Sequence, residues 1–284
     1  MSDFLEQMRL ASEERLAQAM AERPLAELEE RARSMPPAPA ICVGHHGFDI
    51  IAEIKRRSPA LGALADGEPE DVHRQIAERA VAYARGGACA ISVLTEPTRF
   101  DGDLMHLSIA SAAVESLGVP VMRKDFLVHP YQVYEARAAG AGGVLLITRM
   151  LSDERMREML DAAHSVGLFV LVEAFDSDDL RRSHELVAGR PAPLLVGINT
   201  RDLTTLQIDT TRLATHADEF SSDVVAVAES GVTGVEQACT AVALGYRMAL
   251  IGTALMQSEE PISLLQSMLA GGRSVGIYPT PGHA

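Results

Sequence analysis

Eight short apolar segments recur along the chain at intervals typical of alternating strands and helices. They are rich in branched aliphatic residues and lie near residues 49–55, 89–94, 119–124, 143–147, 168–173, 194–198, 224–228 and 248–252. Amphipathic stretches separate most of them, for example 70–86, 131–139, 153–166 and 234–244. Each unit spans roughly 24–40 residues, the length of a strand–helix repeat. Eight such repeats predict an α/β protein with a (β/α)8 TIM barrel.

Glycines and prolines mark the boundaries of these repeats. A glycine follows several expected helices, as in ARGGA, ESLGVP and HSVGL, where it suits a left-handed helix end. A doubly wound open sheet is the alternative, but no GxGxxG motif follows the first strand. Residues 3–34 have helical periodicity broken at Pro24, and the proline-rich MPPAPA follows. We expect a single domain over 1–284, with an N-terminal helical extension at 1–40, the barrel at 41–272 and a tail at 273–284.

Composition excludes several other classes of protein. Hydrophobic residues make up 47% of the chain without any tryptophan, so the core must be aliphatic, as in a parallel sheet covered by helices. The net charge is −14 and no basic run is present, which argues against a nucleic-acid partner. The apolar runs are too short to span a membrane, and the N-terminus lacks the features of a signal peptide.

The cysteines give no sign of a disulfide framework or a zinc site. They are three in number, lie far apart and form no CxxC pair, and the chain also lacks HExxH. We therefore expect a cytoplasmic protein without a metal ion.

Charged and amide side chains lie where the expected strands end. They come from five or six different segments: Glu53 and Lys55, Lys124, Glu173, Asn199 and Arg201, then Glu229 and Ser230. Each could simply meet solvent. In a (β/α)8 barrel, however, the carboxyl ends of all strands surround one mouth, where catalytic groups lie. Glu53 and Lys55 are two residues apart and so share one face of their strand. We expect these side chains to converge.

Two glycine-containing turns follow the last two strands and predict an anion site. They read AESGV, which contains Ser230 and Gly231, and LIGTALM, which contains Gly252 and Thr253. Glycine lets the backbone approach an anion, and these two loops are the usual phosphate site of such barrels. Ser58, after the first strand, could add a hydroxyl group. Pro59, Phe100, Phe126 and Leu145 lie at or near strand ends and could form an apolar wall for an aromatic ligand, with plain packing under a loop as the equal alternative for Phe100 and Leu145.

The chain resembles the indole-3-glycerol phosphate synthase family. Six segments carry the resemblance in order: IAEIKRRSP, SVLTEPTRFDGDL, RKDFLVHPYQVYEARAAGAGGVLLI, LVEAFD, GINTRDL and AESGV…LIGTALM. The family consists of (β/α)8 barrels that need no cofactor. They convert 1-(2-carboxyphenylamino)-1-deoxyribulose 5-phosphate to indole-3-glycerol phosphate, CO₂ and water in tryptophan biosynthesis. The resemblance therefore implies a carbon–carbon lyase with a phosphorylated small-molecule substrate, and association with other enzymes of the same pathway.

The resemblance also implies roles for individual residues. Lys124 is expected to be the general acid and Glu173 the general base, with Glu53 and Lys55 completing the polar set. Asn199 and Arg201 would hold the substrate. Ser58, Gly231, Gly252 and Thr253 would hold the phosphate, and Pro59, Phe126 and Leu145 would pack on the anthranilate ring. A second cation beside Lys124 would lower the pKa of its amine toward proton transfer.

Three positions depart from the family pattern, namely Ala60, Phe175 and Thr253. A paralogue that acts on a substituted anthranilate is therefore one alternative. Another phosphate-binding barrel enzyme is a second, although an isomerase of phosphoribosylanthranilate would need a cysteine at a strand end, and Cys42 and Cys89 precede or begin strands. A barrel that only binds a partner is a third, and the complete set of charged mouth residues argues against it.

Overall fold

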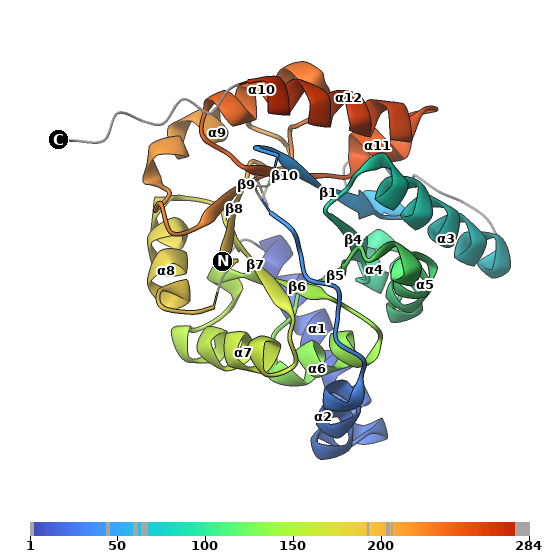
Figure 1. Cartoon of the computed structure of the whole chain (residues 1–284). Helices are drawn as coiled ribbons and strands as arrows, with labels where there is room; N and C mark the ends of the chain where they lie inside the picture. The colour runs from blue at the N-terminus through green and yellow to red at the C-terminus, as the bar shows by residue number, and fades with distance from the viewer. Residues whose placement is uncertain are drawn as a thin grey trace.

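Eight parallel strands close into a barrel at the centre of the molecule (Figure 1). The structure is a computed structural model that describes residues 3–43, 46–58, 62–63, 68–191, 193–202, 205 and 207–275. The barrel strands are β1 (Asp49–Ile54), β4 (Ala90–Leu94), β5 (Val121–Lys124), β6 (Gly143–Ile147), β7 (Phe169–Ala174), β8 (Leu195–Asn199), β9 (Val225–Glu229) and β10 (Met248–Ile251). Every one lies within two residues of a predicted segment, so the predicted barrel is confirmed.

Helices surround the barrel and cover the outer face of its strands (Figure 1). They are α3 (Pro69–Gly86), α5 (Leu104–Val114), α6 (Pro130–Ala138), α7 (Asp153–Ser165), α8 (Ser177–Val187), α9 (Thr211–Thr215), α10 (Val235–Ala243) and α12 (Pro261–Ser274). Shorter elements follow the carboxyl ends of strands: the β2 (Arg57–Ser58) and β3 (Gly62–Ala63) hairpin, α4 (Pro97–Phe100) and α11 (Thr253–Gln257). The helix C-caps predicted from glycine are present, since Gly87 adopts φ 98° after α3.

The strand order is β1-β10-β9-β8-β7-β6-β5-β4, and β1 pairs with both β10 and β4. Each strand is therefore hydrogen-bonded on both sides, and all eight run in the same direction. The parallel register places Asn199 opposite Glu229, and Glu173 opposite Gly197. Because the ladder is continuous, the residues that end each strand lie at one rim of the barrel.

The N-terminal extension consists of two helices, as predicted. They are α1 (Asp3–Glu22) and α2 (Leu25–Ser34), and Pro24 stands between them with an extended backbone. One face of α1 is buried, including Leu5 and Met8. The Tyr131 hydroxyl of α6 donates to the carbonyl groups of Ala19 at 2.8 Å and Arg23 at 3.1 Å. These carbonyls lie where a helix end leaves acceptors unpaired, so Tyr131 fastens the end of α1 to the barrel.

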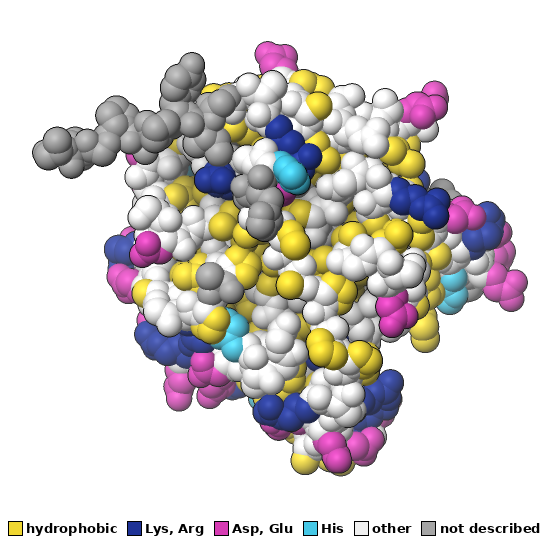
Figure 2. Space-filling model, viewed as in Figure 1, with side chains coloured by type: hydrophobic (Ala, Val, Ile, Leu, Met, Phe, Trp, Pro, Cys, Tyr) yellow, Lys and Arg dark blue, Asp and Glu magenta, His cyan; other side chains and the backbone are white. Residues whose placement is uncertain are grey.

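Most charged side chains on the face shown in Figure 2 lie near the outline of the molecule, over the outer helices. Most buried hydrophobic side chains are aliphatic, as expected from composition, and Tyr83, Tyr246 and Phe48 are the largest fully buried exceptions. All residues of β1, β4, β6, β7, β8 and β10 are buried. Among the described helices, none is long and apolar enough to cross a membrane.

Leu171 offers a test of this core. Its side chain is fully buried on β7, between Leu145 of β6 and Leu195 of β8 in the register of the barrel. Leu171→Ala should lower the free energy of unfolding by about 2–5 kcal/mol, because a cavity replaces the lost methyl groups. Urea denaturation followed by circular dichroism measures the change. Leu10→Ala is the control, since Leu10 is 52% exposed on α1, and an equal loss in both variants would contradict the assignment of the core.

Candidate active site

The carboxyl ends of the barrel strands surround a cavity of about 590 Å³. Thirteen of the residues predicted for the site line it: Glu53, Lys55, Phe100, Lys124, Phe126, Leu145, Glu173, Asn199, Arg201, Ser230, Gly231, Gly252 and Thr253. Of the two others, Ser58 lies in the strand β2, and Pro59 lies outside the described residues. The structure thus brings together side chains that the sequence distributes over all eight barrel strands and the loops that follow them.

An ion pair between Glu53 and Lys55 lies on the barrel side of β1. Lys55 Nζ is 2.6 Å from Glu53 Oε1, and both side chains are largely buried. Burial alone would raise the pKa of the Glu53 carboxyl group, but the positive charges of Lys55 and Lys124 outweigh burial and lower this pKa. The pair is therefore charged, as expected from the two-residue spacing. Gly252 has no side chain here because a Cβ atom would overlap the Glu53 carboxylate.

Lys124 ends β5 and faces Glu173 of β7 across the cavity. The distance from Lys124 Nζ to Glu173 Oε2 is 3.5 Å, and both side chains are mostly buried. Burial would lower the pKa of the amine, but the carboxylates of Glu173, Glu53 and Glu229 together raise it above its usual range. The expectation that a neighbouring cation lowers the pKa of Lys124 is therefore wrong. The main charged neighbours of Lys124 are carboxyl groups, so its side chain is a fully charged ammonium group.

Glu229 is a third carboxyl group in the cavity, and no role for it followed from the sequence. It ends β9 and is buried, and its two carboxyl oxygens meet no hydrogen-bond donor among the described residues. Burial and the adjacent Glu173 carboxylate raise the pKa of Glu229 well above its usual value. Gly197 of β8 lies directly against this carboxyl group, and a Cβ atom there would collide with it. Its position as the last residue of a strand, like that of Lys124, was the signal for it in the sequence.

The turn after β9 has an unusual backbone that suits an anion. Ser230 and Gly231 adopt φ 66° and φ 79°, so two consecutive residues are left-handed. A Cβ atom on Gly231 would lie 2.8 Å from Thr210 Cγ2, which leaves no room for a side chain. Gly252 and Thr253, where α11 begins, line the same part of the cavity. Consecutive backbone N–H groups in such turns form concavities that bind anions.

Arg201 lies in the loop after β8, held by Asn199. The Arg201 backbone N–H donates to Asn199 Oδ1 at 2.9 Å, and the Arg201 backbone forms a bridge with Ile208. Burial lowers the pKa of the Arg201 guanidinium, with a smaller opposing effect from Glu53. The guanidinium group nevertheless supplies a cation to the cavity that the turns of Ser230 and Gly252 also line.

The apolar wall of the cavity contains more aromatic residues than the sequence indicated. The ring of Phe126 lies 6.2 Å from that of Phe100, and 5.9 Å from that of Phe4, between ring centroids. Phe4 and Leu5 come from α1, far from the barrel in sequence, and both line the cavity. Phe175 also lines it, with the guanidinium carbon of Arg149 4.6 Å from its ring centroid. The helical extension therefore forms part of the site.

Lys55 and Lys124 are the two lysines of the entire sequence, whose other basic residues are arginines and histidines. Both line this cavity. Within the part of the chain that the structure describes, no three His, Cys, Asp or Glu side chains gather to hold a metal ion.

The comparisons with known proteins point to one family. The sequence profile described as "Indole-3-glycerol phosphate synthase" matches residues 5–268. The chain is similar to a protein of Mycolicibacterium smegmatis with that name, at 40% identity over 251 residues, or 87% of each chain. It is also similar to one of Nocardioides sp. with the same name, at 44% identity over 222 residues, which cover 78% of this chain and 80% of the relative. These relatives favour neither of the alternative enzymes.

Solved structures share the fold at low sequence identity. The structure of 3-hexulose-6-phosphate synthase from Salmonella typhimurium superposes with a TM-score of 0.59 at 15% identity, over 81% of this chain and all of that chain. Orotidine 5'-phosphate decarboxylase from Pyrococcus horikoshii OT3 gives a TM-score of 0.54 at 16% identity, over 79% of this chain and 99% of that chain. At these identities the similarity supports the barrel fold alone.

Glu229 makes the stability of the protein depend on pH. Its raised pKa means that the folded protein holds this proton more tightly than the unfolded chain does. The stabilisation is complete below the usual glutamate pKa and is lost as pH rises through the raised value. Glu229→Gln cannot ionise, so its free energy of unfolding should increase relative to wild type as pH rises from the usual glutamate pKa to the raised one.

Urea denaturation at each pH measures this difference. Glu236→Gln on α10 is the matched control, because the Glu236 side chain is exposed. If the difference between Glu229→Gln and wild type stayed constant with pH, the carboxyl group would not be protonated in the folded protein.

Proposed function

The chain belongs to the indole-3-glycerol phosphate synthase family, and we propose that the cavity at the mouth of its barrel carries out the ring closure. The substrate is 1-(2-carboxyphenylamino)-1-deoxyribulose 5-phosphate, and the products are indole-3-glycerol phosphate, CO₂ and water. The observation that carries the assignment of the site is the meeting of Lys124 and Glu173, 3.5 Å apart, within one largely buried cavity.

Lys124 is the general acid for ring closure in this proposal. The ring carbon that bears the carboxylate attacks the ketone carbon, and the ketone oxygen must gain a proton as the new carbon–carbon bond forms. The raised pKa of Lys124 keeps its ammonium group charged, so a proton is always available at this position. The positive charge also stabilises the developing negative charge on the ketone oxygen.

Decarboxylation follows from ring closure within the substrate itself. Attack by the ring carbon removes the aromatic character of the ring, which then accepts the electron pair of the breaking bond to the carboxylate. CO₂ leaves and the aromatic ring is restored. The side chains near this step are apolar, including Phe126 and Leu145, and an apolar environment disfavours the charged carboxylate relative to neutral CO₂.

Dehydration needs an acid for the leaving hydroxyl group and a base for a proton on the neighbouring carbon. Glu173 is the base in this proposal, because it is close to Lys124. Lys55 and Glu229 line the same cavity and can supply the proton that converts the hydroxyl group to water. Glu229 carries a proton more readily than an ordinary glutamate, because its pKa is raised well above the usual value.

The remaining cavity residues bind and orient the substrate in this proposal. The turns of Ser230–Gly231 and Gly252–Thr253 and the cation of Arg201 bind the phosphate, with Asn199 holding the Arg201 loop. Phe100, Phe126 and Leu145 contact the anthranilate ring. The proposal for Ser58 and Pro59 rests on the resemblance alone. Association with other enzymes of the tryptophan pathway likewise remains a prediction.

The growth of indole fluorescence and the release of CO₂ from the substrate test the proposed reaction. Purified, folded protein should produce both together in equal amounts. A folded protein that produces neither from this substrate would disprove the proposed function.

Substitution of Lys124 tests its role as a proton donor. Lys124→Arg keeps the positive charge but cannot release its proton at neutral pH. We expect it to lower kcat by roughly 100- to 10,000-fold, the usual contribution of general acid catalysis. Lys124→Met should be at least as impaired, and circular dichroism should show that both variants are folded. If Lys124→Arg retained most of its activity, the lysine would supply charge and no proton.

Gly231→Ala tests the proposed phosphate site. The new methyl group would meet Thr210 and would strain a left-handed backbone, so the turn must shift. Because hydrogen bonds to a charged group are worth about 1.5–3 kcal/mol, loss of one should raise KM roughly 10- to 150-fold. The matched control is Gly234→Ala in the same loop, where φ is −168° and the nearest atom is the flexible end of Gln237. Equal KM values for the two variants would contradict the phosphate site.

A further inference from the structure

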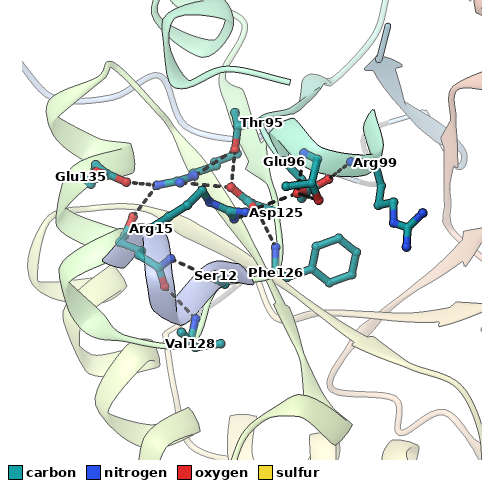
Figure 3. Close-up of polar contacts among 12 residues, drawn as sticks. Ser12, Arg15, Thr95, Glu96, Arg99, Asp125, Phe126, Val128 and Glu135 are labelled. Atoms are coloured by element: carbon teal, nitrogen blue, oxygen red, sulfur yellow. Dashed lines mark hydrogen bonds and ion pairs between the residues drawn. The ribbon is translucent and has the colours of Figure 1, made fainter. Parts of the chain in front are cut away.

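The guanidinium group of Arg15 joins the N-terminal helix α1 to two loops at the mouth of the barrel, those after β4 and β5. Arg15 Nη2 lies 2.8 Å from Asp125 Oδ1, and Arg15 Nη1 lies 3.3 Å from Glu96 Oε1 (Figure 3). The side chains of Asp125 and Glu96 are 0% exposed, whereas that of Arg15 is 25% exposed. Two buried carboxylates from the loops after β4 and β5 thus share one cation from the extension.

Asp125 holds the turn that presents Lys124 and Phe126 to the cavity. Its carboxylate accepts hydrogen bonds from the Phe126 backbone N–H at 2.8 Å and from the Thr95 hydroxyl at 2.7 Å. Arg123 Nη2 donates to Asp125 Oδ2 at 3.1 Å, the same oxygen that accepts from Thr95, and Arg123 Nη1 donates to Glu135 of α6. Because Asp125 lies between Lys124 and Phe126 in the chain, the contacts of its carboxylate fix both neighbours.

Glu96 performs the same task for the loop after β4. Its carboxylate accepts from the backbone N–H groups of Thr98 at 2.8 Å and Arg99 at 2.7 Å, and so caps α4, which carries Phe100. The loop then returns close to the end of β4. A Cβ atom on Gly102 would collide with the backbone of Thr95, so this position has room for glycine alone. The position of Phe100 at the cavity wall therefore depends on the position of Glu96.

The first turn of α1 also contributes to the apolar wall of the cavity, through Phe4. Phe4 precedes Arg15 by eleven residues, about three helical turns, so both lie on one face of the helix. The ring of Phe4 contacts that of Phe126 edge-on. Between them, Ser12 accepts a hydrogen bond at 2.9 Å from Gln132, whose side-chain oxygen accepts from the Val128 backbone N–H at 2.8 Å. This face of α1 thus follows the segment after Lys124 along its length.

We propose that Arg15 is a positioning residue for the reaction. Through Asp125 and Glu96 it fixes the loops that carry Lys124, Phe126 and Phe100, and it holds Phe4 against the cavity. Arg9 of the same helix offers a comparison, because its ion pairs stay within the helix. Arg9 forms ion pairs with Glu6 and Glu13 within α1.

Arg15→Met, with Arg9→Met as its matched control, tests this inference in the full-length chain. The kinetic part of the test depends on the proposed function. We expect Arg15→Met to lower kcat/KM roughly 10- to 100-fold, through both a lower kcat and a higher KM, because a displacement of about 1 Å at the reacting groups has effects of this size. Arg9→Met should match wild type in both constants. The measurements are made at a temperature where circular dichroism shows every variant to be folded.

Hydrogen exchange gives a second readout that needs no substrate. In Arg15→Met, the backbone N–H groups of residues 96–100 and 124–128 should exchange faster than in wild type, and in Arg9→Met they should not. If wild type proves inactive, the proposed function fails, and the exchange rates still test the role of Arg15.

Unchanged kcat and KM in folded Arg15→Met would overturn the inference, even if the melting temperature fell, because that result indicates a structural role alone. If Arg15→Met does not fold, Arg15→Lys replaces it under the same criterion. Lysine keeps the charge but cannot bind two carboxylates with a planar fork, so a smaller fall in kcat/KM is expected.

Discussion

Closure of the parallel sheet is the constraint on which the site depends. Because β1 pairs with both β10 and β4, the sheet has no free edge and all eight carboxyl ends form one ring. Neighbouring strands and loops separate the polar side chains at these ends from bulk solvent. They must face one another across the cavity, and their charges must be arranged so that a buried ion is paired or is neutral.

The charges in the cavity meet this requirement in two ways. Glu53 is paired with Lys55, and Glu173 with Lys124, so each of these carboxyl groups faces a cation. Burial and Glu173 raise the pKa of Glu229 and favour its protonated form, against the smaller opposing effect of Lys124. Arg201 adds a third cation to the cavity, although the chain as a whole has a net charge of −14. Asp125 also lines the cavity, but its carboxylate is paired with Arg15 and Arg123. Lys55, Lys124 and Arg201 together suit a substrate that carries both a phosphate and a carboxylate.

The sequence predicted the barrel and most of the cavity because both depend on local patterns. Strand periodicity and the position of each polar residue at a strand end were sufficient for Glu53, Lys124 and Glu173. The pKa of Lys124 could not be predicted, because it depends on distances to three carboxylates on other strands. Phe4 and Arg15 were missed for a related reason. Their contacts join a helix at the start of the chain to β4 and β5, and helical periodicity alone does not say where a helix docks.

The restriction of lysine to this cavity has a consequence for the chemistry of the whole molecule. Apart from the N-terminus, the only primary amines of the chain belong to Lys55 and Lys124, and every other cationic surface position uses arginine or histidine. Arginine does not react with the acylating and reductively alkylating reagents that label lysine, because its guanidinium group stays protonated. Among the side chains, such a reagent can therefore react at these two cavity positions alone, and the raised pKa of Lys124 makes that amine slow to react. A ligand that fills the cavity would protect both side-chain amines at once, so the mass added at these two lysines reports on occupancy.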